Sequence, residues 1–253
     1  MDKEQEKSKI RFGLIGKNID YSFSRSYFSE KFQQEHLEHH SYENFDIDGI
    51  EQFIDILATN KNIKGFNVTI PYKESIIPYL HKLNKKAEAI GAVNTIRFTK
   101  KGKLVGYNTD YYGFKKSLEP LLKSHHKKAL ILGTGGASKA IAYALKKMNI
   151  DYDFVSRKIS KKATYSYSTL SVDVIKSYQI IINCTPLGTY PNINNYPEIP
   201  YNALTTEHLL YDLIYNPKET TFLKLGKQYG SQTFNGYKML ELQAEKAWRI
   251  WNK

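Results

Sequence analysis

Cysteine is nearly missing from this sequence, because Cys184 is the single one in 253 residues. A lone cysteine excludes an internal disulfide bond and is typical of proteins kept in a reducing compartment. Long apolar runs are missing too: no stretch approaches the roughly 18 apolar residues of a membrane span. The opening MDKEQEKSK (residues 1–9) mixes charges and lacks the apolar core of a signal peptide. We therefore expect a soluble cytoplasmic protein without a membrane partner, and a disordered tail at residues 1–9.

Acidic residues are outnumbered by basic ones, 25 to 37, which gives a formal net charge of +12. Such a charge can indicate a nucleic acid or an anionic ligand. The lysines, however, are spread along the chain in pairs such as Lys85-Lys86 and Lys161-Lys162, and no nucleic-acid-binding motif accompanies them. We therefore expect no nucleic-acid partner.

Potential metal ligands are also scarce. His36 and His40 lie four residues apart, a spacing that places both on one face of a helix. No third ligand follows at a suitable spacing, so we expect no metal site.

What the sequence does contain is an alternation of short apolar strands with helical stretches. In the first half the expected strands are 10–16, 42–47, 65–70 and a hairpin over 92–108 that turns at Lys101-Gly102. The expected helices there are 27–39, 48–59 with Asp48 as a possible N-cap, and 71–83 interrupted by Pro78. The second half shows a strand, turn and helix over 129–148, strands at 151–156, 178–183 and 208–214, and helices at 110–122, 219–230 and 237–251. This alternation predicts an α/β fold with at least partly parallel strands.

A glycine turn, GTGGAS (133–138), joins a buried strand to a helix. Gly133 permits a tight turn, and Gly135 lets the backbone approach a pyrophosphate. The helix N-terminus at Gly136-Ala137 offers N–H groups and the positive end of the helix dipole to it. Ser138 stands where the G-x-G-x-x-G pattern has its third glycine, so the turn alone leaves open a plain strand-to-helix connection.

The next strand indicates which dinucleotide would bind. NAD-binding proteins carry an acidic residue at the end of this strand, for the ribose hydroxyls. Here the strand ends in Ser156, Arg157 and Lys158, while Asp151 and Asp153 come too early. An arginine at that position suits the 2′-phosphate of NADP, although an exposed basic turn is the simpler alternative in a lysine-rich chain. We favour NADP(H) over NAD.

Four polar strings of the first half lie in loops or at strand ends: YSFSRS (21–26), NVTIPYK (67–73), GAVNT (91–95) and GYNTDYYGF (106–114). Ser22 and Ser24 lie two apart, so in an extended segment they point the same way, and with Thr69 they can hold a carboxylate. Asn67 and Asn94 offer a donor and an acceptor each, which suits sugar-like hydroxyls. Asn67 and Thr69 are expected to share one face of a strand, with Lys73 just past its end.

These strings, in this order, resemble shikimate dehydrogenase over residues 12–251. The likeness also rests on the glycine turn, NCTPLG (183–188), DLIYNPKETTFL (212–223) and G-x-x-M-L-x-x-Q-A (236–244). It implies NADPH-dependent, reversible reduction of 3-dehydroshikimate to shikimate in aromatic amino acid biosynthesis. The implied fold is a substrate-binding catalytic domain at 10–110, completed by the helix of 236–253, and a Rossmann-like NADP-binding domain at 111–235. Monomer and homodimer both remain open.

The resemblance also implies a role for individual residues. Lys73 and Asp110 match the catalytic pair, and Ser22 and Ser24 match the serines that bind the carboxylate, with Thr69 nearby. Further matches to substrate-binding residues are Asn67, Asn94, Tyr215 and Gln243. Matches to the cofactor site are Gly133, Gly135, Gly136, Ala137, Ser156, Arg157, Lys158, Thr185 and Gly236.

Three positions depart from the family pattern: Arg25 replaces a proline, Tyr111 a glycine and Tyr190 a methionine. They put fine substrate preference in doubt more than the reaction. Two alternatives remain: a quinate/shikimate dehydrogenase-like paralogue with broader substrate or NAD use, and a non-catalytic NADP-binding regulator on the same fold. Retention of both Lys73 and Asp110 speaks against the regulator, which has no need of a proton relay.

Overall fold

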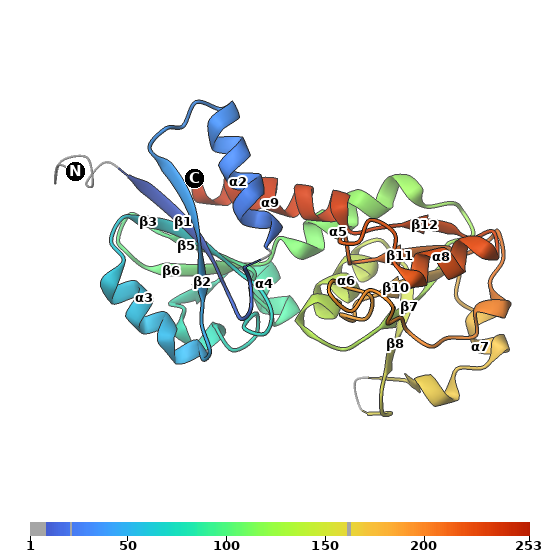
Figure 1. Cartoon of the computed structure of the whole chain (residues 1–253). Helices are drawn as coiled ribbons and strands as arrows, with labels where there is room; N and C mark the ends of the chain where they lie inside the picture. Colours follow the sequence, from blue (N-terminus) through green and yellow to red (C-terminus); the bar gives the residue numbers. More distant parts are fainter. Residues whose placement is uncertain (1–8, 21, 161–162) are drawn as a thin grey trace. The chain divides into compact units, whose positions relative to one another are not determined.

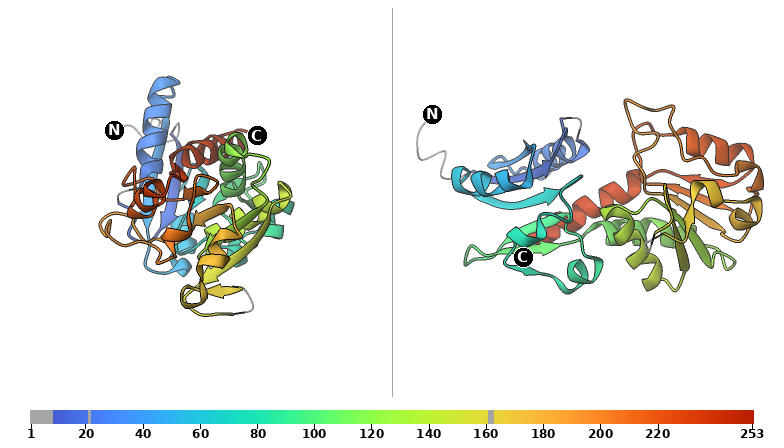
Figure 2. Two further views of the ribbon diagram at one scale, coloured as in Figure 1. Left: turned by 90° about the vertical axis from the view of Figure 1, so that its right-hand side faces the viewer. Right: turned by 90° about the horizontal axis from the view of Figure 1, so that it is seen from below.

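The computed structural model of the chain describes residues 9–20, 22–160 and 163–253 (Figure 1). These residues form two compact units. The first holds the chain up to Thr109 together with Ala244–Lys253, and the second holds Asp110–Gln243. Each unit is built on a six-stranded sheet with helices packed on it (Figures 1 and 2). Among the described residues, none of the helices combines the length and apolar composition needed to cross a lipid bilayer.

The sheet of the first unit is mixed and has the order β2-β1-β3-β5-β6-β4. Its strands are β1 (Ile10–Gly16), β2 (His40–Asp46), β3 (Ile63–Val68), β4 (Lys82–Leu83), β5 (Thr95–Phe98) and β6 (Leu104–Tyr107). β1 pairs in parallel with β2 and β3, whereas β5 is antiparallel to β3 and β6. The predicted hairpin is confirmed, because β5 and β6 are joined through Gly102, whose φ is 72°.

The helices of the first unit are α2 (Phe23–Gln34), α3 (Phe53–Thr59) and α4 (Lys85–Ile90). The predicted start of the first helix near residue 27 was wrong, because Ser22 already caps it. Asp48 is not an N-cap: a short 3-10 turn at Ile50–Gln52, preceded by Gly49, leads into α3. The predicted helix 71–83 is instead a series of turns and a 3-10 helix at Ile77–Tyr79. Pro78 explains this, because it lacks an N–H donor and disfavours the α conformation of the residue before it.

The C-terminal residues 244–253 complete an aromatic core in the first unit. The Trp251 ring stacks on Phe12 with 4.7 Å between centroids and lies 5.2 Å from Phe28. Its indole Nε1–H donates to the Ile96 carbonyl at 3.0 Å. Gly65 is needed beneath it, since a Cβ there would lie 2.2 Å from the indole. The last helix, α9 (Tyr237–Trp251), thus supplies core side chains to a sheet formed more than 150 residues earlier.

Neighbouring strands run parallel in the sheet of the second unit, which has the order β12-β11-β10-β7-β8-β9. Its strands are β7 (Lys128–Leu132), β8 (Asp151–Ser156), β9 (Tyr165–Ser166), β10 (Ile180–Asn183), β11 (Leu209–Asp212) and β12 (Gln232–Phe234). Its helices are α5 (Asp110–Leu118), α6 (Gly136–Lys147), α7 (Val172–Lys176), α8 (Thr221–Gln228) and the first part of α9. Counted from β7, the order is 6-5-4-1-2-3, that of a Rossmann sheet.

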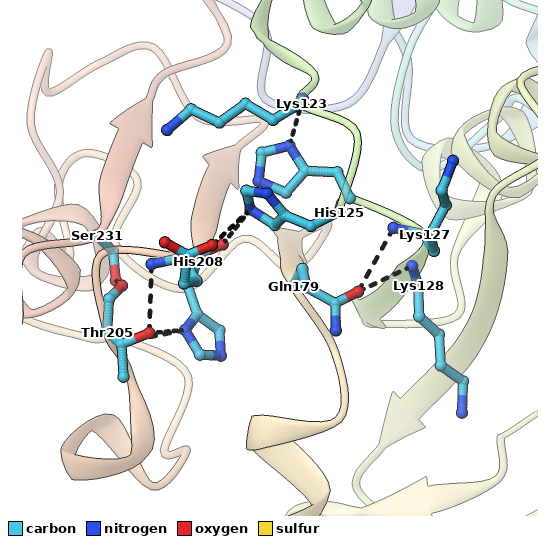
Figure 3. Close-up of polar contacts among 10 residues, drawn as sticks. Lys123, His125, Lys127, Lys128, Gln179, Thr205, His208 and Ser231 are labelled. Atoms are coloured by element: carbon cyan, nitrogen blue, oxygen red, sulfur yellow. Dashed lines mark hydrogen bonds and ion pairs between the residues drawn. The ribbon is translucent and has the colours of Figure 1, made fainter.

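Polar side chains form hydrogen bonds with backbone groups at the amino-terminal edge of this parallel sheet (Figure 3). The Gln179 side-chain carbonyl accepts from the backbone N–H groups of Lys127 and Lys128, at 3.4 and 3.3 Å. The His208 ring nitrogen Nδ1 accepts from the Thr205 N–H at 3.1 Å, and burial lowers the pKa of this histidine. These side chains satisfy backbone groups. Ligands of open α/β sheets bind at the opposite edge, where the strands have their carboxyl ends.

Candidate active site

A buried network of amides and hydroxyls lies at the ends of β3, β5 and β6 in the first unit. Asn67, the fifth residue of β3, donates from Nδ2 to the Asn94 carbonyl at 3.1 Å and to Thr95 Oγ1 at 3.3 Å. The Asn94 side-chain oxygen accepts from the Thr109 N–H at 2.7 Å, and Asn94 Nδ2 donates to Thr109 Oγ1 at 2.9 Å. Two predicted substrate residues, Asn67 and Asn94, are thus brought together.

The network continues toward the two predicted catalytic residues. The Val93 N–H donates to the Lys73 carbonyl at 2.7 Å, which fixes the Lys73 backbone beside GAVNT. The Lys73 side chain is half-buried. Asp110 follows Thr109 directly and is the first residue of α5, where it is 5% exposed. Lys73 belongs to the first unit and Asp110 to the second.

Ser22 and Ser24 do not lie in an extended segment, so that expectation was wrong. Ser22 is the N-cap of α2, and its Oγ accepts from the Ser24 N–H at 3.3 Å. Ser24 is inside the first turn and is buried. A serine such as Ser22 can cap a helix instead of continuing a strand. Its hydroxyl then accepts from a backbone N–H of the first turn that has no carbonyl partner. The structure therefore makes one serine a cap and turns the other inward.

Thr69 lies just beyond β3, which ends at Val68. Its N–H donates to the Ile15 carbonyl at 2.9 Å, so the segment still follows β1. Its methyl group approaches Gly16 so closely that a Cβ there would lie 2.5 Å from it. Gly16 thus leaves room for Thr69 at the carboxyl-terminal end of β1.

The glycine turn of the second unit has the geometry that its sequence predicts. Gly133 has a φ of 105°, a conformation that other residues rarely adopt, and its N–H donates to the Val155 carbonyl at 2.8 Å. Gly135 is the N-cap of α6, with open space where a side chain would be. Gly136 and Ala137 are the first residues of α6, whose N–H groups have no carbonyl one turn earlier. Ser138, in place of the third glycine, donates to the Gly135 carbonyl at 2.7 Å.

Parallel pairing gathers the other predicted cofactor residues at the same edge as this turn. Leu132 is in register with Val155 on β8 and with Asn183 on β10. The turn after β8 therefore lies beside Gly133, and Thr185 is closer still: its Cγ2 is 3.1 Å from where a Gly133 Cβ would be. Arg157 and Lys158 are exposed, and the Ser156 hydroxyl donates to the Lys158 carbonyl.

Asp153 is unavailable as a ribose ligand, in agreement with its early position in β8. Its carboxylate accepts from Thr164 Oγ1 at 2.7 Å and from the Tyr178 hydroxyl at 2.6 Å. These bonds and Lys128 hold the pKa of Asp153 below its usual value, against an opposing effect of burial.

An aspartate that the sequence analysis did not single out organises two loops at this edge. Asp212 ends β11, is fully buried, and accepts from Asn183 Nδ2 and the Ile214 N–H, both at 3.0 Å, and from Thr220 Oγ1 at 2.6 Å. Asn183 in turn accepts from Thr185 Oγ1 at 2.6 Å. Burial raises the pKa of Asp212 to about 6. This pair connects the loop of Thr185 with the loop that follows β11.

The loop after β11 carries Tyr215, which is half-buried. The adjacent Ile214 carbonyl accepts from the Gly236 N–H at 3.0 Å. Gly236 has no room for a side chain, since a Cβ would lie 2.1 Å from the Leu213 carbonyl oxygen. Gln243 is buried on α9, where Gly113 of α5 allows close helix packing: a Cβ on Gly113 would lie 3.1 Å from Gln243.

The three departures from the family pattern lie in different surroundings. Arg25 and Tyr190 are exposed, the former on α2 and the latter before Pro191. Tyr111 is buried, and its ring meets Tyr143 of α6 edge to face at 5.3 Å. Its size is therefore accommodated by packing of α5 on α6.

Several buried polar residues of the site were missed in the sequence: Tyr42, Thr95, Thr109, Asn183, Asp212 and Thr220. Thr95, Thr109, Asn183, Asp212 and Thr220 stand inside the quoted motifs, so their neighbours were the available signal. No sequence signal pointed to Tyr42, because its strand has the residue types of any half-buried β-strand.

The sheet order, the glycine turn and the basic strand end define the second unit as a dinucleotide-binding Rossmann fold. Residues 14–96 match the model of the shikimate dehydrogenase substrate binding domain. The NADP(+)-dependent shikimate dehydrogenase of Methanococcus maripaludis is 39% identical over 94% of this chain and 90% of its own length. The chain belongs to the shikimate dehydrogenase family, which confirms the resemblance seen in its motifs.

Solved structures agree with this assignment. A shikimate dehydrogenase in complex with NADP+ is 35% identical, with a TM-score of 0.83 over 96% of this chain and 90% of that one. A quinate dehydrogenase from Corynebacterium glutamicum in complex with NAD is 25% identical, also with a TM-score of 0.83, over 96% and 93%. The predicted two-domain α/β fold is confirmed.

Proposed function

We propose that this protein catalyses the NADPH-dependent, reversible reduction of 3-dehydroshikimate to shikimate, a step in aromatic amino acid biosynthesis. The observation that carries the proposal is the buried network of Asn67, Thr95, Asn94 and Thr109. It leads to the chain position before Asp110, and the neighbouring Val93 N–H holds the backbone of Lys73. The family motifs thus form one hydrogen-bonded structure on the substrate side.

The residues assigned to the substrate are suited to a ring that carries several hydroxyls and one carboxylate. Asn67 and Asn94 supply amides, and Ser22, Ser24 and Thr69 supply hydroxyls for the carboxylate. Tyr215 and Gln243 are the further residues that the family resemblance assigns to the substrate. Hydroxyl groups can hold a carboxylate without burying an opposing charge, which limits the cost of desolvation.

Lys73 and Asp110 are the proposed catalytic residues. Hydride addition to the ketone carbon leaves a developing alkoxide, which needs a positive charge and a proton within hydrogen-bond reach. The Lys73 ammonium is a compact cation that stabilises this oxygen and can give it a proton. Asp110 is the second member of the pair, a carboxylate that can accept a hydrogen bond from an ammonium or a hydroxyl. In the reverse direction the same pair takes the proton from the alcohol.

The second unit fits NADP(H), which supplies the hydride. The N–H groups of Gly136 and Ala137 meet the pyrophosphate, and Gly135 leaves space for it to approach. Arg157 would bind the 2′-phosphate through charge-assisted hydrogen bonds, and Lys158 would add a second positive charge beside it. The Ser156 hydroxyl stabilises this turn through its bond to the Lys158 carbonyl. Thr185 and Gly236 complete the cofactor side. In this proposal the two units are a substrate-binding domain and an NADP-binding domain, in a cytoplasmic monomer or homodimer.

The test is a rate assay with purified protein that follows NADPH formation by near-ultraviolet absorbance. Shikimate and quinate are each offered with NADP+ and with NAD+. Rapid reduction of NADP+ by shikimate alone supports the proposal. Comparable rates with quinate or NAD+ support the broader paralogue, a candidate because a quinate dehydrogenase with NAD is among the structural relatives. Folded protein that binds NADP+ but shows no rate with any pair supports the regulator.

A further inference from the structure

The Asn67 side chain has its hydrogen-bonding groups assigned by the buried network. Its two Nδ2 hydrogens go to the Asn94 carbonyl and Thr95 Oγ1, and its Oδ1 accepts from the Tyr42 hydroxyl at 2.8 Å. A side-chain carbonyl has two lone pairs. Within the described residues, the second lone pair of Oδ1 is therefore the hydrogen-bonding capacity that Asn67 retains.

Tyr42 is placed to hold that orientation. It lies on β2, 4% exposed, and its ring stacks on Phe28 with 4.7 Å between centroids. Burial raises the pKa of Tyr42 well above its usual value, so its hydroxyl keeps its proton and acts as a donor. A flipped Asn67 amide would turn its NH2 group toward the Tyr42 O–H and its oxygen toward the Asn94 carbonyl, which cannot donate.

We propose that Tyr42 is a positioning residue for substrate selection: it fixes Asn67 so that this amide presents a carbonyl acceptor to the ligand. Asn67 then selects a ring hydroxyl that donates a hydrogen bond and rejects a group that only accepts. The proposal rests on the proposed function, because it takes Asn67 as a ligand of the shikimate ring. Beyond that function, it specifies that Asn67 acts as a hydrogen-bond acceptor and that Tyr42 orients it.

The alternative is that the Tyr42 hydroxyl is merely satisfied within the core. Tyr42→Phe separates the two, because it removes the donor and keeps the ring. We expect KM for shikimate to rise about tenfold, the equivalent of one buried hydrogen bond, with kcat changed less than about threefold and KM for NADP+ unchanged. A loss of thermal stability without a rise in KM for shikimate would overturn the proposal, as would an equal rise in both KM values.

Tyr211→Phe is the matched control. Tyr211 is also a buried tyrosine, on β11 of the second unit, and its hydroxyl bonds Ser117 Oγ at 2.7 Å. It is expected to lose stability as Tyr42→Phe does while keeping the wild-type KM for shikimate. A tenfold rise in the control as well would show a general effect of buried hydroxyls and would count against Tyr42.

A second measurement does not depend on whether Tyr42→Phe folds. Shikimate analogues with fluorine in place of each ring hydroxyl accept but cannot donate a hydrogen bond. We expect the wild-type protein to bind one of them at least about tenfold more weakly than shikimate, and Asn67→Ala to lose that discrimination at the same ring position. Equal binding of all analogues, or unchanged discrimination in Asn67→Ala, overturns the proposal. Failure of the proposed function looks different, because the wild-type protein would then not oxidise shikimate at all.

Discussion

A single lysine decides the chemistry proposed for the first unit. Lys73→Ala removes the cation and proton donor beside the developing alkoxide, while the glycine turn is untouched. We expect kcat to fall by about 10³-fold or more, with KM for NADP+ nearly unchanged. Steady-state kinetics with both substrates varied gives both constants. Lys64→Ala, at an exposed lysine of β3, is the control and should behave as wild type. A Lys73→Ala enzyme with full kcat would remove Lys73 from the mechanism.

Arg157 is the residue proposed to set the choice of cofactor. Arg157→Ala should raise KM for NADP+ by about 10- to 100-fold and leave KM for NAD+ nearly unchanged, because the 2′-phosphate is the group that only NADP+ carries. The ratio of the two KM values is the readout. The control is Lys176→Ala, at an exposed lysine in the last turn of α7. It removes one positive charge, as Arg157→Ala does, but lies outside the turn after β8. An equal rise for both cofactors would assign Arg157 to the pyrophosphate or to the fold instead.

At the scale of elements, strand ends position the site and loops connect them. Asp212 has a pKa of about 6 in the folded protein, against about 3.8 when exposed, because burial favours its neutral form. Between these values the native state binds more protons than the unfolded state. Its contribution is therefore fully present below pH about 4 and is lost as pH rises to about 6.

Asp212→Asn should remove this dependence. The asparagine oxygen can still accept from Asn183 and Ile214, and its NH2 can face the Thr220 hydroxyl, so the loops keep their connection. We expect the free energy of unfolding to fall less steeply from pH 4 to 6 in the variant, by on the order of 2 to 3 kcal/mol. Urea unfolding at a series of pH values measures the difference, and parallel wild-type and variant curves would contradict it.

The elements also show where sequence patterns misled. Strand alternation predicts a shared face for the two serines of YSFSRS, but the segment starts a helix, and Ser22 is its N-cap. Period-two and capping patterns are ambiguous over so few residues. The sequence predicts a helix over 71–83 that Pro78 interrupts, whereas the structure has turns and a 3-10 helix at Ile77–Tyr79. In both places the local conformation differs from the one predicted.

At the scale of the whole molecule, the last helix packs into the core of the first unit. Trp251→Ala should lower the free energy of unfolding by about 3–5 kcal/mol, since it leaves a cavity beside Phe12 and Phe28 and removes the hydrogen bond to the Ile96 carbonyl. Chemical denaturation followed by circular dichroism measures it. Trp248→Ala, at a half-buried tryptophan of the same helix, should cost clearly less. Equal losses would show that α9 docks through its whole length rather than through Trp251.

The sequence alone was sufficient for the fold class, the family and the hairpin, because these depend on local periodicity, turn chemistry and a fixed order of motifs. It also pointed to Gly133, whose positive φ follows from a tight strand-to-helix turn. The site residues that it nominated stay predictions until the variants are made. The domain boundaries at 110 and 235 likewise stay predictions beside the observed units.

Only the tertiary structure decided how those residues are held. Asn67 and Asn94 are 27 positions apart, and Tyr42 lies 25 positions before Asn67, yet one hydrogen-bonded network joins them. Asp212 meets Asn183 across neighbouring parallel strands in the same way. No local pattern encodes such contacts, since they depend on which strands become neighbours and in which register. Burial then makes each of them consequential, because a polar group without a partner is costly away from water.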